Sequence, residues 1–164
     1  MSEKIYLAFC VHSHQPVGNF PGVFEKGARN CYLPLLRILA DYPGITMTLH
    51  YTGPLWEWFE ENEPVFFDLL AKLTGRGQVE LMGGGFYEPI IPVIPEADAR
   101  DQIEYMSAYL EGRFGVRPRG MWCAERIWDP GVPKKIAGSG IEYTLLDDSH
   151  FLSTGLSPDD IHGY

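Results

Sequence analysis

The sequence has few cysteines and no cluster of basic residues. Its three cysteines, Cys10, Cys31 and Cys123, are widely spaced and form no CxxC pair. A disulfide framework needs more cysteines at closer spacing, so a reducing compartment fits the chain and we expect a cytoplasmic location. The formal net charge is −9. An acidic chain repels phosphate backbones and anionic lipid surfaces, so neither nucleic acid nor a membrane is an expected partner.

Long apolar runs and several common functional motifs are also missing. The apolar run Ile5–Val11 is too short for a membrane span, and no small-residue cleavage site follows it. There is no GxGxxG fingerprint after a strand, no P-loop, no GxSxG elbow and no HExxH helix. Dinucleotide binding, NTP binding, serine hydrolysis and zincin chemistry therefore lack support.

The chain does contain the pattern of one α/β domain. Hydrophobic residues make up 45% and aromatic residues 13% of its 164 residues, enough for a real core. Short apolar runs alternate with amphipathic stretches, which predicts a parallel sheet with connecting helices. The predicted strands are Ile5–Val11, Ile45–Tyr51, Val79–Met82, Gly120–Cys123 and Tyr143–Leu146. The predicted helices cover Tyr32–Leu39, Pro64–Leu73, Glu96–Phe114 and a short stretch from Asp129–Pro130 to Gly138 or Gly140.

Polar and aromatic residues follow each predicted strand. In chain order these segments read HSHQP, YTGPLWEW, GGGFYEP, AERIWDP and DDSHF. The carboxyl ends of parallel strands meet on one face, where α/β proteins bind ligands. The sequence therefore predicts a functional site built from several strand ends.

The first and third of these segments supply ligand-binding candidates. His12 and His14 alternate along a strand end, so their side chains point to the same side. They could bind a metal ion, hydrogen-bond a polyhydroxy ligand or serve structure alone. In GGGFYEP the glycines allow a close backbone approach to a ligand or a positive φ, Tyr87 offers a flat face and Glu88 is an acceptor. Glu80, on the preceding strand, needs a partner, either a ligand or an arginine.

The fourth segment contains the strongest catalytic candidate. Glu125 lies between Trp122 and Trp128 in MWCAERIWDP. A carboxylate buried among indoles is destabilising unless partners offset its desolvation, and Arg126 or a histidine could keep it ionised. Indole faces also suit sugar rings, so we interpret Glu125 as a catalytic carboxylate. The alternative is a surface cluster of charges beside two core tryptophans.

The fifth segment adds Asp147, Asp148 and His150. These residues could orient other groups of the site or bind a metal ion together with His12 and His14. An ordinary acidic turn at a strand end is the alternative.

Three of these segments occur together, in order, in a known family. HSHQP, GGGFYEP and MWCAERIWDP resemble the first three signature regions of glycoside hydrolase family 57. GIEYTLLDDSHF resembles the segment that follows them in its 4-α-glucanotransferase and α-amylase-like members. The resemblance implies a (β/α)7-type barrel, an α-glucan or maltooligosaccharide substrate, retention of anomeric configuration and no cofactor. It also implies that Glu125 is the nucleophile and that His12, His14, Glu80 and Trp122 line the donor subsite.

The resemblance also implies that part of the barrel lies outside this sequence. The family's acid/base aspartate belongs to a fourth motif, downstream of Tyr164, and five strands are predicted where seven are expected. We therefore expect residues 1–164 to be the N-terminal part of the catalytic domain, truncated after about the fifth strand. Open sheet edges would favour self-association, and loss of the general acid removes a rate factor of roughly 10²–10⁴.

Two other functions stay open on the sequence. One is a metal-dependent hydrolase or deacetylase with His12, His14, Asp148 and His150 as ligands. The other is a sugar-binding remnant without catalytic activity.

Overall fold

Six parallel strands form the centre of the molecule. The computed structural model describes residues 6–161. Within this range the strands form two three-stranded sheets, with orders β1-β2-β3 and β4-β5-β6, and every strand pair is parallel. The predicted α/β class with parallel strands is confirmed. The strands are β1 Cys10–Ser13, β2 Met47–Tyr51, β3 Val79–Leu81, β4 Gly83–Gly84, β5 Gly120–Trp122 and β6 Tyr143–Thr144.

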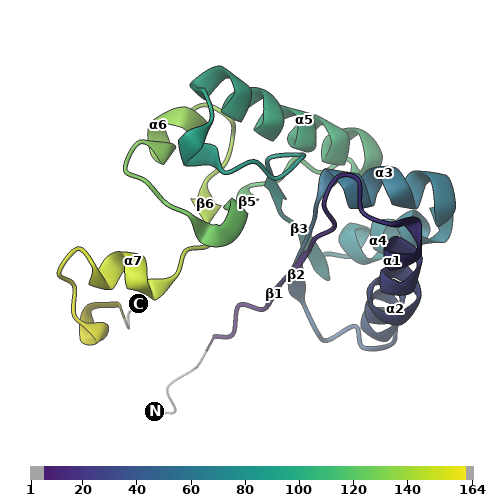
Figure 1. The fold of residues 1–164 in the computed structure, drawn as a ribbon. Helices are drawn as coiled ribbons and strands as arrows, with labels where there is room; N and C mark the ends of the chain where they lie inside the picture. The colour runs from purple at the N-terminus through teal and green to yellow at the C-terminus, as the bar shows by residue number, and fades with distance from the viewer. Residues whose placement is uncertain (1–5, 162–164) are drawn as a thin grey trace, which may run out of the picture.

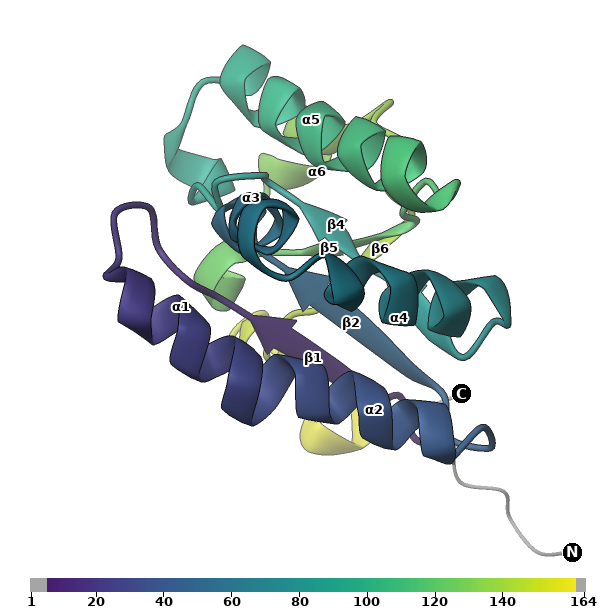
Figure 2. The same cartoon turned by 90° about the vertical axis from the view of Figure 1, so that its right-hand side faces the viewer.

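Helices connect the consecutive strands other than β3 and β4, which Met82 alone separates, and cover one side of them. Figures 1 and 2 show α1 to α5 as a layer on the same side of the strands, as right-handed crossovers between parallel strands require. The short helix α7 lies away from that layer (Figure 1). The helices are α1 Pro21–Gly27, α2 Leu33–Asp41, α3 Gly53–Asn62, α4 Pro64–Gly75, α5 Glu96–Phe114, α6 Val132–Ile136 and α7 Asp148–Leu152. A π-helical segment, Ala28–Tyr32, joins α1 to α2, and 3-10 turns cover Ile91–Val93, Ala124–Arg126 and Pro158–Ile161.

Helix α5 shows how local sequence sets an element. Glu96 and Asp98 place negative charge in its first turn, where the helix dipole favours it. Gly115 ends it in the left-handed conformation, with φ 68° and an N–H that bonds the Glu111 carbonyl at 2.8 Å. One face is buried at helical spacing, by Ala99, Ile103, Met106 and Leu110. The predicted bounds of this helix are confirmed.

An aromatic core holds the helical layer to the first sheet. Tyr51 at the end of β2 meets Trp56 and Phe59 of α3 and Phe66 of α4. The rings of Phe59 and Phe66 stack with centroids 3.8 Å apart. All four side chains are at most 1% exposed. The segment YTGPLWEW therefore contributes mainly to the core, and most of it forms α3.

The bounds of all five predicted strands differ from the observed ones, most of all at the first strand. The first was expected at Ile5–Val11, but β1 is Cys10–Ser13, and Ile5 lies outside the described residues. Pairing with β2 decides this register, because Cys10 to Ser13 lie opposite Thr48 to Tyr51. The apolar Tyr6 and Leu7 are left 86% and 87% exposed. The third predicted strand is also followed by a further one, β4, formed by the glycine run.

Residues 6–161 include no helix long and apolar enough to cross a membrane. The three cysteines, all within this range, are free thiols.

Candidate functional site

A carboxylate with three donors marks the candidate site, at the carboxyl-end face of the strands. Glu88 follows β4 in a left-handed conformation, with φ 54°. Its Oε1 lies 3.1 Å from His12 Nε2 and accepts a hydrogen bond of 2.8 Å from Trp122 Nε1. Its Oε2 contacts His14 Nδ1. We call these four residues the Glu88 cluster.

The cluster keeps Glu88 ionised despite its burial. Its side chain is only 8% exposed. Burial alone would raise the pKa of the Glu88 carboxyl, but the hydrogen bonds and charges of His12 and His14 hold that pKa below its ordinary value. We predicted that Glu88 accepts hydrogen bonds. In the structure its carboxylate oxygens are bonded to the neighbouring side chains of the chain itself.

His50, which we did not select from the sequence, contacts the Glu88 cluster through His12. It lies opposite His12 in the sheet, and the two Nδ1 atoms are 2.8 Å apart. Burial lowers the pKa of His50 to about 3, helped by the charge of His12, so the ring is neutral near neutral pH. His12 donates its Nε2–H to Glu88 whichever of the two Nδ1 atoms carries the shared proton. The signal in the sequence was a histidine inside the largely buried run MTLHY.

Stacked rings fix the orientation of the cluster. The rings of His12 and Trp122 stack with centroids 4.2 Å apart and an interplanar angle of 11°. The His50 ring stacks below His12 at 4.9 Å. Planar side chains held in this way have little rotational freedom, so the donors are already aimed before any ligand binds.

The glycine run serves this packing. Gly84 has φ 152°, and a Cβ there would lie 3.0 Å from the Trp122 carbonyl oxygen and 3.3 Å from His50 Nε2. A Cβ on Gly85 would lie 2.5 Å from Pro89 Cδ. We expected the glycines to admit a ligand or to take positive φ, and Gly84 takes positive φ. The close approach that Gly84 and Gly85 allow is to other parts of the chain.

Glu125 lies on a strained turn directly after β5. Both Glu125 and Arg126 are left-handed, with φ 51° and 52°. For residues with a side chain this conformation costs about 1–2 kcal/mol each. Strain of this kind is typical of functional sites, where surrounding contacts hold a side chain in a required direction.

The surroundings of Glu125 differ from the prediction. We expected a carboxylate buried between Trp122 and Trp128 and held ionised by Arg126 or a histidine, with a surface cluster of charges as the alternative. The turn instead leaves Glu125 exposed, so no large desolvation has to be offset. The Arg126 guanidinium bonds Asp147 Oδ1 at 2.7 Å, and the Arg126 carbonyl lies 2.9 Å from His150 Nε2. Asp147 and His150 thus hold Arg126, the residue that follows Glu125, in place.

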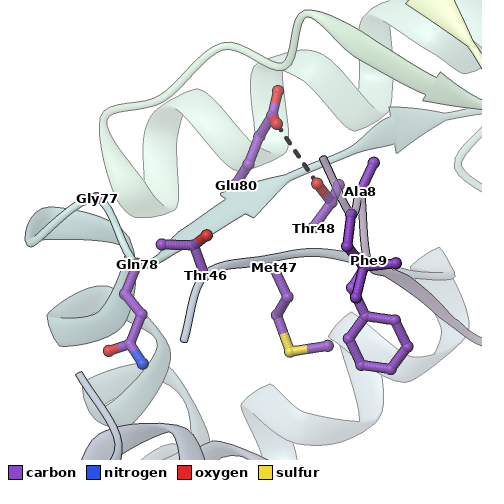
Figure 3. Close-up of a pocket in the computed structure, with 9 residues that line it drawn as sticks. Ala8, Phe9, Thr46, Met47, Thr48, Gly77, Gln78 and Glu80 are labelled. Carbon is purple, nitrogen blue, oxygen red and sulfur yellow. Dashed lines mark hydrogen bonds between the residues drawn. The ribbon is translucent and has the colours of Figure 1, made fainter. Parts of the chain in front are cut away.

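Glu80 lies on the same face of the sheet as His50, but closer to the amino ends of the strands. It pairs with Thr48 in the register of β2 and β3, whereas His50 is two residues further along β2. Its carboxylate accepts hydrogen bonds from Tyr143 at 2.7 Å and Thr48 at 3.4 Å. Figure 3 shows Glu80 and Thr48 pointing toward each other at the side of a hollow of about 300 Å³. The partner of Glu80 is therefore a tyrosine rather than an arginine.

The remaining predicted residues do not join the Glu88 cluster. Tyr87 turns away from it, donates to Glu57 Oε1 at 2.9 Å and is 44% exposed. Asp148 is exposed at the start of α7.

One group in the described range has the geometry of a metal site. Ligand atoms of His12, His14 and Glu88 all lie within 4.8 Å of one another. Two imidazoles and a carboxylate suit zinc and similar ions. Asp148 and His150, which the sequence analysis combined with the two histidines, are not in this group.

Comparison with known proteins agrees with these motifs. The profile of Glycosyl hydrolase family 57 matches residues 8–160. The chain belongs to glycosyl hydrolase family 57. It is 44% identical over its whole length to α-amylase 1 of Dictyoglomus thermophilum and 43% identical over 97% of its length to a 4-α-glucanotransferase of Thermococcus litoralis. It spans about a quarter of these relatives, 24% in each case.

Solved structures extend the comparison to the fold. The crystal structure of the Thermococcus litoralis 4-α-glucanotransferase matches this family 57 chain with a TM-score of 0.93 over 97% of the chain and 25% of that protein. An α-amylase from Thermotoga maritima, 19% identical, matches with a TM-score of 0.73 over 89% of the chain and 40% of that protein, which shows a shared fold. The predicted partial barrel is therefore confirmed for this family 57 chain.

Proposed function

We propose that the complete protein carrying this sequence is a retaining α-glucan-active enzyme, either a hydrolase or a 4-α-glucanotransferase. The observation that carries the proposal is the strained turn that exposes Glu125 at the carboxyl-end face, on the same strand end as Trp122 of the Glu88 cluster. The relatives named α-amylase and 4-α-glucanotransferase supply the substrate class.

In this proposal Glu125 is the nucleophile. Retaining enzymes use two carboxyl groups about 5–5.5 Å apart, one that attacks the anomeric carbon and one that protonates the leaving oxygen. The exposed Glu125 carboxylate can approach a sugar without moving buried neighbours. We propose that an aspartate beyond residue 164 supplies the acid, so that residues 1–164 are the N-terminal part of the catalytic domain.

The Glu88 cluster would hold the donor sugar. His14 is 45% exposed at its side chain, and its Nε2, which has no partner among residues 6–161, can reach a sugar hydroxyl. Both ring nitrogens of His12 are bonded, to Glu88 and His50, so we propose that its partly exposed ring contributes a packing surface beside Trp122. Glu88 orients both imidazoles and the Trp122 indole. The proposed roles of Glu80, Tyr87, Asp148 and His150 in binding remain predictions, as do the cytoplasmic location, the absence of a cofactor and self-association through open sheet edges.

Glu125→Gln in the complete protein tests the assignment. The amide keeps the shape but cannot attack, so we expect kcat on maltooligosaccharides to fall on the order of 10⁴-fold. The matched control is Glu142→Gln, an exposed carboxylate that pairs with Arg119 and should leave kcat unchanged. Normal activity of the Glu125 variant would exclude the nucleophile assignment. NMR of the first product should show the α-anomer, and inversion would exclude a retaining mechanism.

A metal-dependent hydrolase or deacetylase is the second candidate, because His12, His14 and Glu88 could hold an ion. Elemental analysis of the dialysed protein separates the two functions. Stoichiometric zinc that is needed for activity would favour this candidate over the glycosidase.

A further inference from the structure

A groove beside the Glu88 cluster has no role in the chemistry described so far. It is a hollow of about 470 Å³ between the loop after β1 and helix α3. Pro16 at one wall is two residues after His14, and Tyr87 at another directly precedes Glu88, so the groove adjoins the cluster. We call it the α3 groove. Its lining residues are Pro16, Val17, Gly18, Phe24, Pro54, Glu57, Trp58, Glu61 and Tyr87.

Aromatic rings in the groove are held in fixed positions. Phe24 and Trp58 stack with centroids 5.8 Å apart and an interplanar angle of 24°. Trp58 also meets the core residue Phe59 edge-on at 5.6 Å. The bond from the Tyr87 hydroxyl to Glu57 fixes the third ring. Because these rings are already ordered in the folded protein, a ligand that packs on their flat apolar surfaces loses little side-chain entropy on binding.

The charged side chains of the groove are two carboxylates, which accept hydroxyl protons. Glu57 and Glu61 are four residues apart on α3 and therefore lie on the same face of the helix. Like charges at this spacing destabilise a helix by about 0.2–0.5 kcal/mol. Neither carboxylate has an ion-pair partner among residues 6–161. The lining contains no lysine or arginine, so an anionic ligand is disfavoured.

Flat apolar surfaces combined with carboxylates that have no ion-pair partner in the described part of the chain match a neutral polyol. The C–H face of a pyranose can pack on an aromatic ring while its hydroxyls donate to carboxylates. We propose that the α3 groove binds glucosyl units of an α-glucan that are remote from the bond being cleaved. The groove thereby sets the preference of the enzyme for chain length. This inference rests on the proposed function.

The test compares a short and a long substrate in the complete protein. Trp58→Ala removes the central ring, and we expect kcat/KM for maltoheptaose to fall about tenfold. The value for maltotriose should change less than twofold, because a short chain does not reach the groove. Trp58→Phe keeps a flat face and should recover most of the loss.

Trp58 also contacts the core, so a second variant is needed. Glu61→Ala changes an exposed side chain and should leave folding intact. It should lower kcat/KM for maltoheptaose about threefold with maltotriose unaffected. Equal losses for both substrates, or unchanged values for both variants, would overturn the inference alone. Absence of turnover of either oligosaccharide by the unmodified protein would overturn the proposed function, and this inference with it.

Discussion

Replacing Glu88 by glutamine should destabilise the fold as well as the site. The charged carboxylate accepts from Trp122 and His12 and contacts His14. A glutamine offers one acceptor oxygen, and its NH₂ group must face a donor. The substitution therefore removes one partner and weakens the others.

The magnitude follows from this count. Hydrogen bonds to a charged group contribute about 1.5–3 kcal/mol and neutral ones about 0.5–1.5 kcal/mol, so each retained bond loses about 1 kcal/mol. The lost bond to His14 costs about 1 kcal/mol more, because that side chain is 45% exposed and can bond water instead. Glutamine is easier to bury than a carboxylate, which returns about 1 kcal/mol. We expect a net loss of about 2 kcal/mol in the free energy of unfolding.

The loss should also depend on pH. The folded pKa of Glu88 lies below its ordinary value, so around that range the unfolded state binds more protons. The stabilisation by Glu88 is then complete above the unfolded carboxyl pKa of about 4.3 and disappears as pH falls through the lower, folded pKa. The difference between wild type and Glu88→Gln should therefore shrink below about pH 4.

Urea denaturation, followed by tryptophan fluorescence at several pH values, measures both effects. Glu57→Gln is the control, because Glu57 is exposed and accepts one bond, from Tyr87, so its loss should stay within about 0.5 kcal/mol. Equal stabilities of the two variants at pH 7, or a difference from wild type that grows on acidification, would refute this account of the cluster.

Two further substitutions test other parts of the site. His50→Phe removes the partner of His12 together with a buried Nε2 that has no partner among residues 6–161, so the unfolding free energy should change by less than about 1 kcal/mol. Binding of maltooligosaccharide to the complete protein, followed by calorimetry, should nevertheless weaken severalfold; unchanged affinity would exclude a positioning role for His50. Glu125→Gly relieves a left-handed residue and should raise the unfolding free energy by about 0.5–1 kcal/mol while abolishing activity. A lower stability in urea would show that the turn is unstrained.

The features that the sequence predicted correctly are those set by residues close together in the chain. The bounds of α5 followed from its charged first turn and its apolar spacing. His12 and His14 were placed on the same side by alternation along the chain, and both do contact Glu88. The position of β1 was missed because its register depends on pairing with β2, which lies about 40 residues away in the chain.

Two features of the site required coordinates. The exposure of Glu125 depends on left-handed backbone at two residues with side chains, which the sequence does not favour. The role of His50 depends on strand register, because only pairing of β1 with β2 brings it opposite His12. A histidine in a buried strand indicates that its ring has a polar partner, but the sequence does not identify that partner.

A single residue, Met82, separates β3 from β4, and these two strands belong to different sheets. The length of residues 79–84 therefore fixes the position of β4 in the second sheet relative to β3 in the first sheet. Inserting or deleting one residue there would shift β4 against β5 and carry Glu88 away from Trp122, while β3 kept its place on β2. Length variation among related chains should consequently collect in the connections outside this stretch, and residues 79–84 should keep a constant length.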